Sequence, residues 1–384
     1  MKGRNLKLDN AKGILITLVV IGHMLLPIQG TTRGVTNFFY MIYTFHMPAF
    51  VFISGLLAQH IYTRVPKPHF NWCRWCSTLW LYLLFQFILF FSEIPAYGRT
   101  TRFPDFLHTS GAPWYLLALL LWYLMIPFFY AYRGKVLPVG LLFSNHRSLP
   151  DEHTQAGHRL QASEGCAQRG IPYSLIAWIL LTIMSLAGGY LASGALAGLG
   201  DFPPFFFAGY FIGPERLMRF LKKERGIVLL LTALGLLCFA LVGTQTFDRL
   251  LPYRNVVYGA WYYRFHPEQN PAAFPGDLAS CLWLIRLAWF LVSGPMSFAL
   301  LALMPNRRLP LLTTIGQRTL QIYILHRPIR DLLLAGGFIT AAGPENSAHV
   351  LLLIALSILL TIVLSAGILQ RLFDAIQKLP ERLV

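Results

Sequence analysis

Residues 8–23 read LDNAKGILITLVVIGH, and this stretch decides the fold. A polar, basic start leads into an apolar run that reaches about residue 29, contains a histidine and is followed by no small-residue cleavage site. Its length approaches the roughly 20 residues with which an α-helix crosses a bilayer. We therefore expect an uncleaved first transmembrane helix rather than a secretory signal.

The rest of the chain repeats this pattern. Of its 384 residues only 12% are charged and 55% are hydrophobic, whereas soluble domains carry about 25% charged residues. Ten apolar runs stand between charged, Pro-containing and Gly-containing segments, at approximately 13–29, 36–60, 75–92, 113–132, 173–192, 202–214, 226–246, 277–303, 310–334 and 348–370. The sixth is short and begins with prolines, so we expect it to be broken or tilted. The sequence predicts an all-α, polytopic membrane bundle of about ten transmembrane helices, forming one domain over residues 1–384.

The distribution of basic residues predicts the orientation. Most of the 32 Lys and Arg residues fall on alternate loops if the N-terminus is inside, so we expect both termini in the cytoplasm and a multi-pass protein of a bacterial plasma membrane. Residues 133–172 are polar and aperiodic, which predicts a flexible cytoplasmic loop. The net charge of +16 comes from short clusters without a basic domain, so nucleic acid is not expected as a partner. The five scattered cysteines predict no disulfide framework and no metal site.

Lys12 and His23 are the sharpest candidates for chemistry. Eleven residues at about 100° each place both side chains on one helix face, about 16 Å apart. A cation at the membrane edge can hold phosphates, and a deeper imidazole can accept a hydroxyl proton. An interfacial lysine that snorkels would explain Lys12 equally well. For His23 the functional interpretation is favoured, because ionisable residues inside spans are costly.

Two of the expected spans carry cations without carboxylate partners. Arg318 and His326 lie eight residues apart in span 310–334, nearly on one helix face, and Arg286 lies in span 277–303. The 16 acidic residues are too few and too often in loops to neutralise these arginines. We expect Arg286 or Arg318 to face a hydrated cavity shared with His23, whereas lipid phosphates would explain Arg327 and Arg330 equally well.

The remaining candidates are a histidine and aromatic residues. His46, followed by Pro48, either lines the same cavity or is a buried histidine bonded across helices. Trp114 and Tyr115 form either an interfacial aromatic belt or a site wall. Trp261, in the expected outer loop 247–276, suits a sugar ring or an interfacial anchor equally.

Four motifs in order resemble the membrane-bound acyltransferase-3 family, especially its fucose 4-O-acetylase and polysaccharide O-acetyltransferase branch. They are a basic residue followed after ten residues by histidine (Lys12 to His23), FHMPAFVFISG (45–55), PWYLLALLLWYL (113–124) and IGQRTLQIYILH (315–326). Arginine is commoner in the family at the position of Lys12.

The resemblance implies transfer of an acetyl group from cytoplasmic acetyl-CoA to a hydroxyl of a surface polysaccharide or lipid-linked sugar. His23 would be the general base or transient acyl carrier, and Lys12, Arg74, Arg286 and Arg318 would contact the donor. His46, Trp114, Tyr115, Trp261 and His326 are the candidates for acceptor binding, and membrane lipids are expected partners. Two alternatives stay open. One is a transporter or flippase for a glycolipid or anionic small molecule, and the other is a haem protein with axial ligands from His23, His46 and His326.

Overall fold

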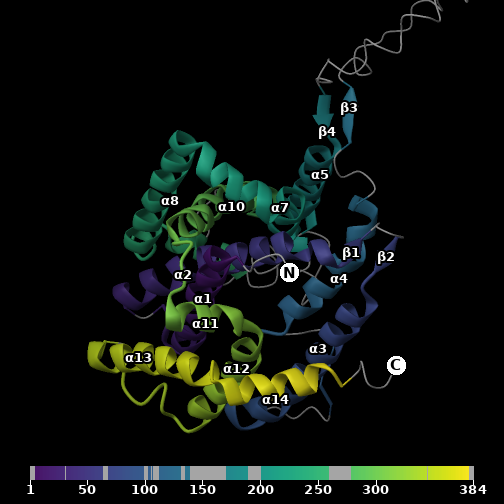
Figure 1. Cartoon of the computed structure of the whole chain (residues 1–384). Coiled ribbons are helices and arrows are strands. Elements are labelled where there is room, and N and C mark those ends of the chain that lie inside the picture. The colour runs from purple at the N-terminus through teal and green to yellow at the C-terminus, as the bar shows by residue number, and fades with distance from the viewer. Residues whose placement is uncertain are drawn as a thin grey trace, which may run out of the picture.

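The computed structural model describes residues 5–30, 32–63, 68–98, 103–104, 106, 112–130, 135–138, 170–188, 200–258, 278–343 and 345–379. In these ranges the chain is a bundle of α-helices with two short strand pairs (Figure 1). Strand β1 (Tyr62–Thr63) pairs antiparallel with β2 (His69–Phe70). Strand β3 (Val136–Pro138) pairs antiparallel with β4 (Gly170–Pro172), so the two ends of the predicted 133–172 loop meet, while most of that loop lies outside the described residues.

The helices follow most of the predicted spans. They are α1 (Leu6–Leu25), α2 (Arg33–Leu57), α3 (Trp72–Tyr97), α4 (Trp114–Tyr130), α5 (Tyr173–Gly188), α7 (Pro203–Lys223), α8 (Arg225–Gln245), α10 (Leu278–Leu303), α11 (Pro310–Gln317), α12 (Thr319–Ala335), α13 (Ser347–Leu364) and α14 (Gly367–Gln377), with 3₁₀ segments η1 (Leu26–Ile28), η2 (Ala58–His60) and η4 (Leu251–Tyr258). Within the described ranges, six helical segments are long and apolar enough to cross a membrane, and α4 and α5 are shorter apolar helices. The all-α membrane class is therefore confirmed, while the count of ten and the sides of the termini stay predictions.

Large apolar side chains are exposed on the outside of the bundle. On α8, at the periphery in Figure 1, Leu229 is 72% exposed and Leu237 is 64% exposed. A contiguous apolar surface of this kind is rare on a water-soluble monomer. This chain is a multi-pass membrane protein.

Two predicted spans are interrupted. Span 310–334 is not one helix, because Arg318 (φ −118°, ψ 25°) separates α11 from α12. Span 348–370 is divided between α13 and α14 at Ser365 and Ala366. The sixth span is broken as expected: α7 runs on to Lys223 but contains Gly213 at φ 70°, ψ 158°, a conformation that glycine adopts readily. Arg318 and His326 therefore do not share a face of one continuous helix.

Glycines allow the central helices to touch through their backbones. A Cβ on Gly316 would lie 1.7 Å from the Asp9 carbonyl oxygen, and one on Gly55 would lie 1.9 Å from the Phe206 carbonyl oxygen. Such close approach through small residues is typical of membrane helix packing. It brings α11 into contact with α1, and α2 into contact with α7.

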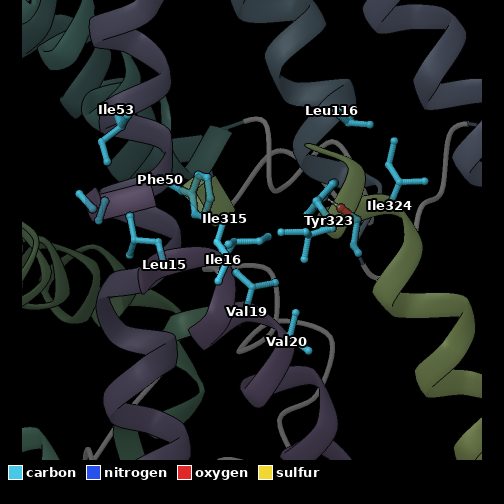
Figure 2. Close-up of a cluster of buried hydrophobic side chains, with 14 of the residues drawn as sticks. Leu15, Ile16, Val19, Val20, Phe50, Ile53, Leu116, Ile315, Tyr323 and Ile324 are labelled. Atoms are coloured by element: carbon cyan, nitrogen blue, oxygen red, sulfur yellow. Dashed lines mark hydrogen bonds between the residues drawn. The ribbon is translucent and has the colours of Figure 1, made fainter. Parts of the chain in front are cut away.

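Helix α1 lies at the centre of the apolar core. Figure 2 shows its buried side chains together with residues of α2, α4, α11 and α12, namely Leu15, Ile16, Val19, Val20, Phe50, Ile53, Leu116, Ile315, Tyr323 and Ile324. Burial of large apolar side chains contributes about 1.5–3 kcal/mol each relative to water. This core fixes the position of α1, the helix that carries Lys12 and His23.

Candidate active site

The two histidines of α1 and α12 form a direct pair. His23 Nδ1 lies 2.7 Å from His326 Nε2, and the rings are nearly parallel with centroids 5.0 Å apart. His326 is fully buried, whereas His23 keeps part of its surface accessible. The structure brings together His23, predicted as the catalytic residue, and His326, predicted for acceptor binding; both roles stay predictions.

A backbone contact determines which ring nitrogens of this pair carry a hydrogen. His326 Nδ1 lies 3.0 Å from the Ile322 carbonyl oxygen, which can only accept a hydrogen bond, so Nδ1 carries the hydrogen. In a neutral ring His326 Nε2 is then an acceptor, and His23 Nδ1 must donate to it. The same rule leaves His23 Nε2 with a free lone pair. The pair thus presents His23 Nε2 as a proton acceptor.

A buried charged cluster holds the end of α1 at this point. Arg330 Nε donates to the His23 carbonyl oxygen at 3.1 Å, and its Nη1 donates to the Tyr97 hydroxyl and to Asp331 Oδ1. Arg327 Nη2 lies 3.4 Å from Glu93 Oε1. Both arginines are buried, so the suggestion that they contact lipid phosphates is wrong. The carboxylates come from α3 and from α12 itself.

A cavity of about 330 Å³ lies between α1, α2, α3, α4, α12 and α14. Lys12, Arg74 and Arg318 all line it, so three of the four cations predicted for the donor meet in one place. Tyr115 lines it as well. Polar groups such as His60, Gln317, Gln321 and Gln370 line it beside the cations, and apolar residues such as Val19, Phe50, Ile53 and Leu116 line the part toward the core.

The three cations differ in their contacts. Lys12 Nζ forms an ion pair with Asp9 Oδ1 at 2.8 Å, and Gln317 Nε2 donates to Asp9 Oδ2 at 3.3 Å. Arg318 donates to the Ser365 carbonyl oxygen. Arg74 is exposed at the start of α3. Within the described ranges no carboxylate pairs with Arg74 or Arg318, so positive charge dominates this end of the cavity.

The deep end of the cavity reaches toward the histidine pair. Val19 lines the cavity and lies seven residues after Lys12, a rise of about 10 Å along α1; His23 follows about 6 Å further. Tyr323, which also lines it, packs against His326 with ring centroids 6.3 Å apart. Neither histidine is among the lining residues. The shared cavity predicted from the sequence therefore ends one helical turn short of the pair.

Tyrosine hydroxyls form the polar wall near this deep end. The hydroxyls of Tyr115 and Ser54 lie 2.6 Å apart, and the Tyr323 hydroxyl donates to the Ala112 carbonyl oxygen. Tyr323 was missed as a site residue, although it lies in the motif that carries His326. Its position three residues before that histidine, on the same helix face, was the available signal.

Arg286 lies elsewhere. Its Nη2 is 2.7 Å from Asp201 Oδ1 in a pair that is almost fully buried, and its guanidinium carbon lies 4.6 Å from the centre of the Trp289 ring. The expectation that Arg286 lacks a carboxylate is therefore wrong. The partner comes from a segment 85 residues away, which no spacing in α10 reveals. Arg286 does not line the cavity with Lys12.

The remaining candidates are placed as follows. His46 is buried beside Tyr43, and its Nδ1 lies 2.7 Å from the Ile42 carbonyl oxygen; its neighbour Met47 lines the cavity. Trp114 stacks on Phe202 outside the cavity lining. Trp261 lies outside the described residues. No group of three or more His, Cys, Asp or Glu side chains in the described part of the chain is placed to hold a metal ion.

Comparison with known proteins gives one family match, two relatives and no solved structure. Residues 5–145 match a family model, acyltransferase-3, described as an acyltransferase domain. Nodulation protein NolL of Mesorhizobium japonicum is 41% identical over 90 residues, which cover 20% of this chain and 24% of that protein. Nodulation protein NolL of Sinorhizobium fredii is 32% identical over 147 residues, which cover 34% of this chain and 38% of that protein. No solved structure matches the chain significantly.

The matched region contains Lys12, His23, Arg74 and Tyr115, whereas Arg318 and His326 come from beyond it. The alignments span less than half the length of these relatives. The motif from Lys12 to His23 lies within the matched segment, in the helix that the fold places at the centre of the site. Over residues 5–145 this chain is similar to the acyltransferase-3 family that the four sequence motifs indicated.

Proposed function

We propose that this protein is a membrane O-acyltransferase that moves an acetyl group from cytoplasmic acetyl-CoA to a hydroxyl of a surface glycan or glycolipid. One observation carries the proposal. A cavity with Lys12, Arg74 and Arg318 at one end leads to within one helical turn of His23, whose Nε2 is a free proton acceptor.

The residues around the cavity suit the two chemically different parts of acetyl-CoA. Guanidinium and ammonium groups bind phosphates through charge-assisted hydrogen bonds, which Lys12, Arg74 and Arg318 can provide. The apolar part beside Val19 and Phe50 suits the slender arm that carries the thioester. At about 330 Å³ the cavity is near the lower limit for small-molecule sites, so it would hold the arm while the nucleotide stays at the charged end.

His23 would act as the general base. Its Nε2 takes the proton of the acceptor hydroxyl while the hydroxyl oxygen bonds to the thioester carbonyl carbon. The carbon–sulfur bond then breaks, and His23 returns the proton to the leaving thiolate. A positioned base of this kind typically contributes about 10² to 10⁴ in rate. The hydrogen bond to His326 would hold the imidazole in the required tautomer throughout.

The test uses the full chain in lipid nanodiscs with radiolabelled acetyl-CoA and an envelope extract as the acceptor source. His23→Ala should lose about 10²-fold or more in acetyl incorporation while its affinity for acetyl-CoA stays near wild type. His69→Ala, which changes an exposed histidine in β2, is the matched control and should remain active.

The outcomes separate the candidate functions. Retention of more than about a tenth of the activity by His23→Ala would remove His23 from the role of base. Uptake of labelled substrate into sealed vesicles without any acetyl transfer would instead favour a transporter, for which the break between α11 and α12 is also suitable. Mass spectrometry of surface glycans from cells with and without the gene would then identify the acceptor.

A further inference from the structure

A second cavity, of about 490 Å³, lies between α2, α8, η4 and α10. It shares no lining residue with the cavity at Lys12. Aliphatic and aromatic side chains make up most of its lining, among them Val242, Leu250, Val257, Ile285 and Val292. A cavity with this lining favours an apolar ligand.

Arg254 is the charged residue in this lining. Its side chain is half-buried, and its guanidinium carbon lies 5.9 Å from the centre of the Tyr40 ring. In the part of the chain that the structure describes, Arg254 forms no ion pair with a carboxylate. A cation in apolar surroundings is costly unless an anion accompanies it. The ligand therefore needs a negative group beside its apolar part.

The position of the cavity in the bundle points to a lipid. It borders α8, whose outer side chains are exposed and apolar, and its rim includes Leu284, which is 48% exposed. Arg254 follows the end of the α8 span at Gln245 by nine residues, near the level where lipid headgroups meet a membrane protein. From Leu284 to Val292 the cavity follows α10 for about 12 Å, enough for part of an acyl or isoprenoid chain.

We propose that this cavity binds a membrane lipid through one apolar chain, with the phosphate of the lipid at Arg254. Aromatic contacts connect this site to His46 of α2. The Tyr258 ring packs against both Tyr40 and Tyr43, and Tyr43 packs against His46. A lipid seated here lies against α2, but its binding does not depend on the acyltransferase reaction.

The experiment measures lipid binding directly. The full chain, purified in detergent, is titrated with phosphatidylglycerol, a polyprenyl phosphate and diacylglycerol, and bound lipid is counted by native mass spectrometry. We expect both phosphate-bearing lipids to bind and diacylglycerol to bind much more weakly. Arg254→Gln should weaken binding of the phosphate-bearing lipids about five- to tenfold, since one basic residue contributes about 1 kcal/mol to attraction of an anionic lipid.

Two further variants make the result specific. Arg249→Gln changes an exposed arginine that does not line the cavity, and it should bind lipid like wild type. Ala288→Trp fills the cavity and should prevent binding even though Arg254 is intact. Melting temperatures show whether each variant is folded.

Comparison of the titrations with phosphatidylglycerol and with polyprenyl phosphate identifies which kind of lipid supplies the phosphate. Preference for polyprenyl phosphate over phosphatidylglycerol would assign the site to a carrier lipid, and equal binding would assign it to bulk phospholipid. Equal losses in Arg254→Gln and Arg249→Gln would overturn the proposal. So would diacylglycerol binding as tight as that of the phosphate-bearing lipids, or full displacement of lipid by inorganic phosphate.

Discussion

Replacement of His326 tests whether a histidine pair, rather than His23 alone, forms the base. His326→Leu replaces the imidazole with an apolar side chain of similar size in a fully buried position, so no large cavity forms. It removes the acceptor that lies 2.7 Å from His23 Nδ1. His326→Gln restores an oxygen that can accept the same hydrogen bond.

The size of the effect follows from that one contact. A buried donor that loses its partner costs about 1–3 kcal/mol. We expect the free energy needed to hold His23 in its reactive orientation to rise by this amount. Since about 1.4 kcal/mol corresponds to a factor of ten, kcat should then decrease about 5- to 150-fold. Most of this range lies below the roughly 10² to 10⁴ expected for removal of the base itself. His326 does not line the donor cavity, so the KM for acetyl-CoA should stay unchanged.

The assay is acetyl incorporation in nanodiscs at varied donor concentration, with melting temperatures to confirm that each variant is folded. We expect His326→Gln to recover most of the activity that His326→Leu loses. Near wild-type kcat in the leucine variant would refute the argument that His326 sets the tautomer. A glutamine variant no better than leucine, with both folded, would show that the ring of His326 matters for another reason.

Three other substitutions separate donor binding from stability. Lys12→Ala should weaken acetyl-CoA binding while Lys12→Arg keeps most of it, as measured by calorimetry; unchanged affinity in both would leave Lys12 with a topological role only. Arg286→Gln should lower the free energy of unfolding by about 3–5 kcal/mol because it removes the guanidinium that pairs with the buried Asp201 carboxylate, with donor affinity unaffected; an unchanged melting temperature would contradict this. Gly316→Ala should destabilise the contact between α1 and α11 by more than 1 kcal/mol, whereas Gly34→Ala, with open space around it, should leave the melting temperature unchanged.

The local sequence pattern was sufficient to predict the membrane class and the common helix face of Lys12 and His23. Apolar runs placed most helices, and the helical repeat placed Lys12 and His23 on the same side of α1. Arg74, named from the resemblance, and Arg318, named for its charge within a span, line the same cavity as Lys12. Spacing within one helix and the cost of charge in an apolar segment were the signals for Lys12, His23 and Arg318, and the roles of these residues stay predictions.

Long-range pairing could not be predicted in the same way. His23 and His326 are 303 residues apart, and only the packing of α12 against α1 brings them together. Hydropathy also failed to show the break at Arg318, because the run from 310 to 334 stays apolar on both sides of it. Two residues before the break, Gly316 lies directly against the Asp9 backbone of α1, a contact between two helices that the hydropathy of one segment does not show.

The buried ion pairs show which basic residues are neutralised inside the bundle and which are left at the cavity. Three of the buried carboxylates in the described part of the chain pair with buried arginines: Asp201 with Arg286, and Glu93 and Asp331 with Arg327 and Arg330. These pairs neutralise the cations that would otherwise be costly in a low-dielectric interior. The cations without such compensation, Arg74 and Arg318, remain at the cavity beside Lys12. Since Asp9 offsets only Lys12 there, the site retains net positive charge, and a polyphosphate donor would be attracted to this end of the cavity rather than to the histidine pair.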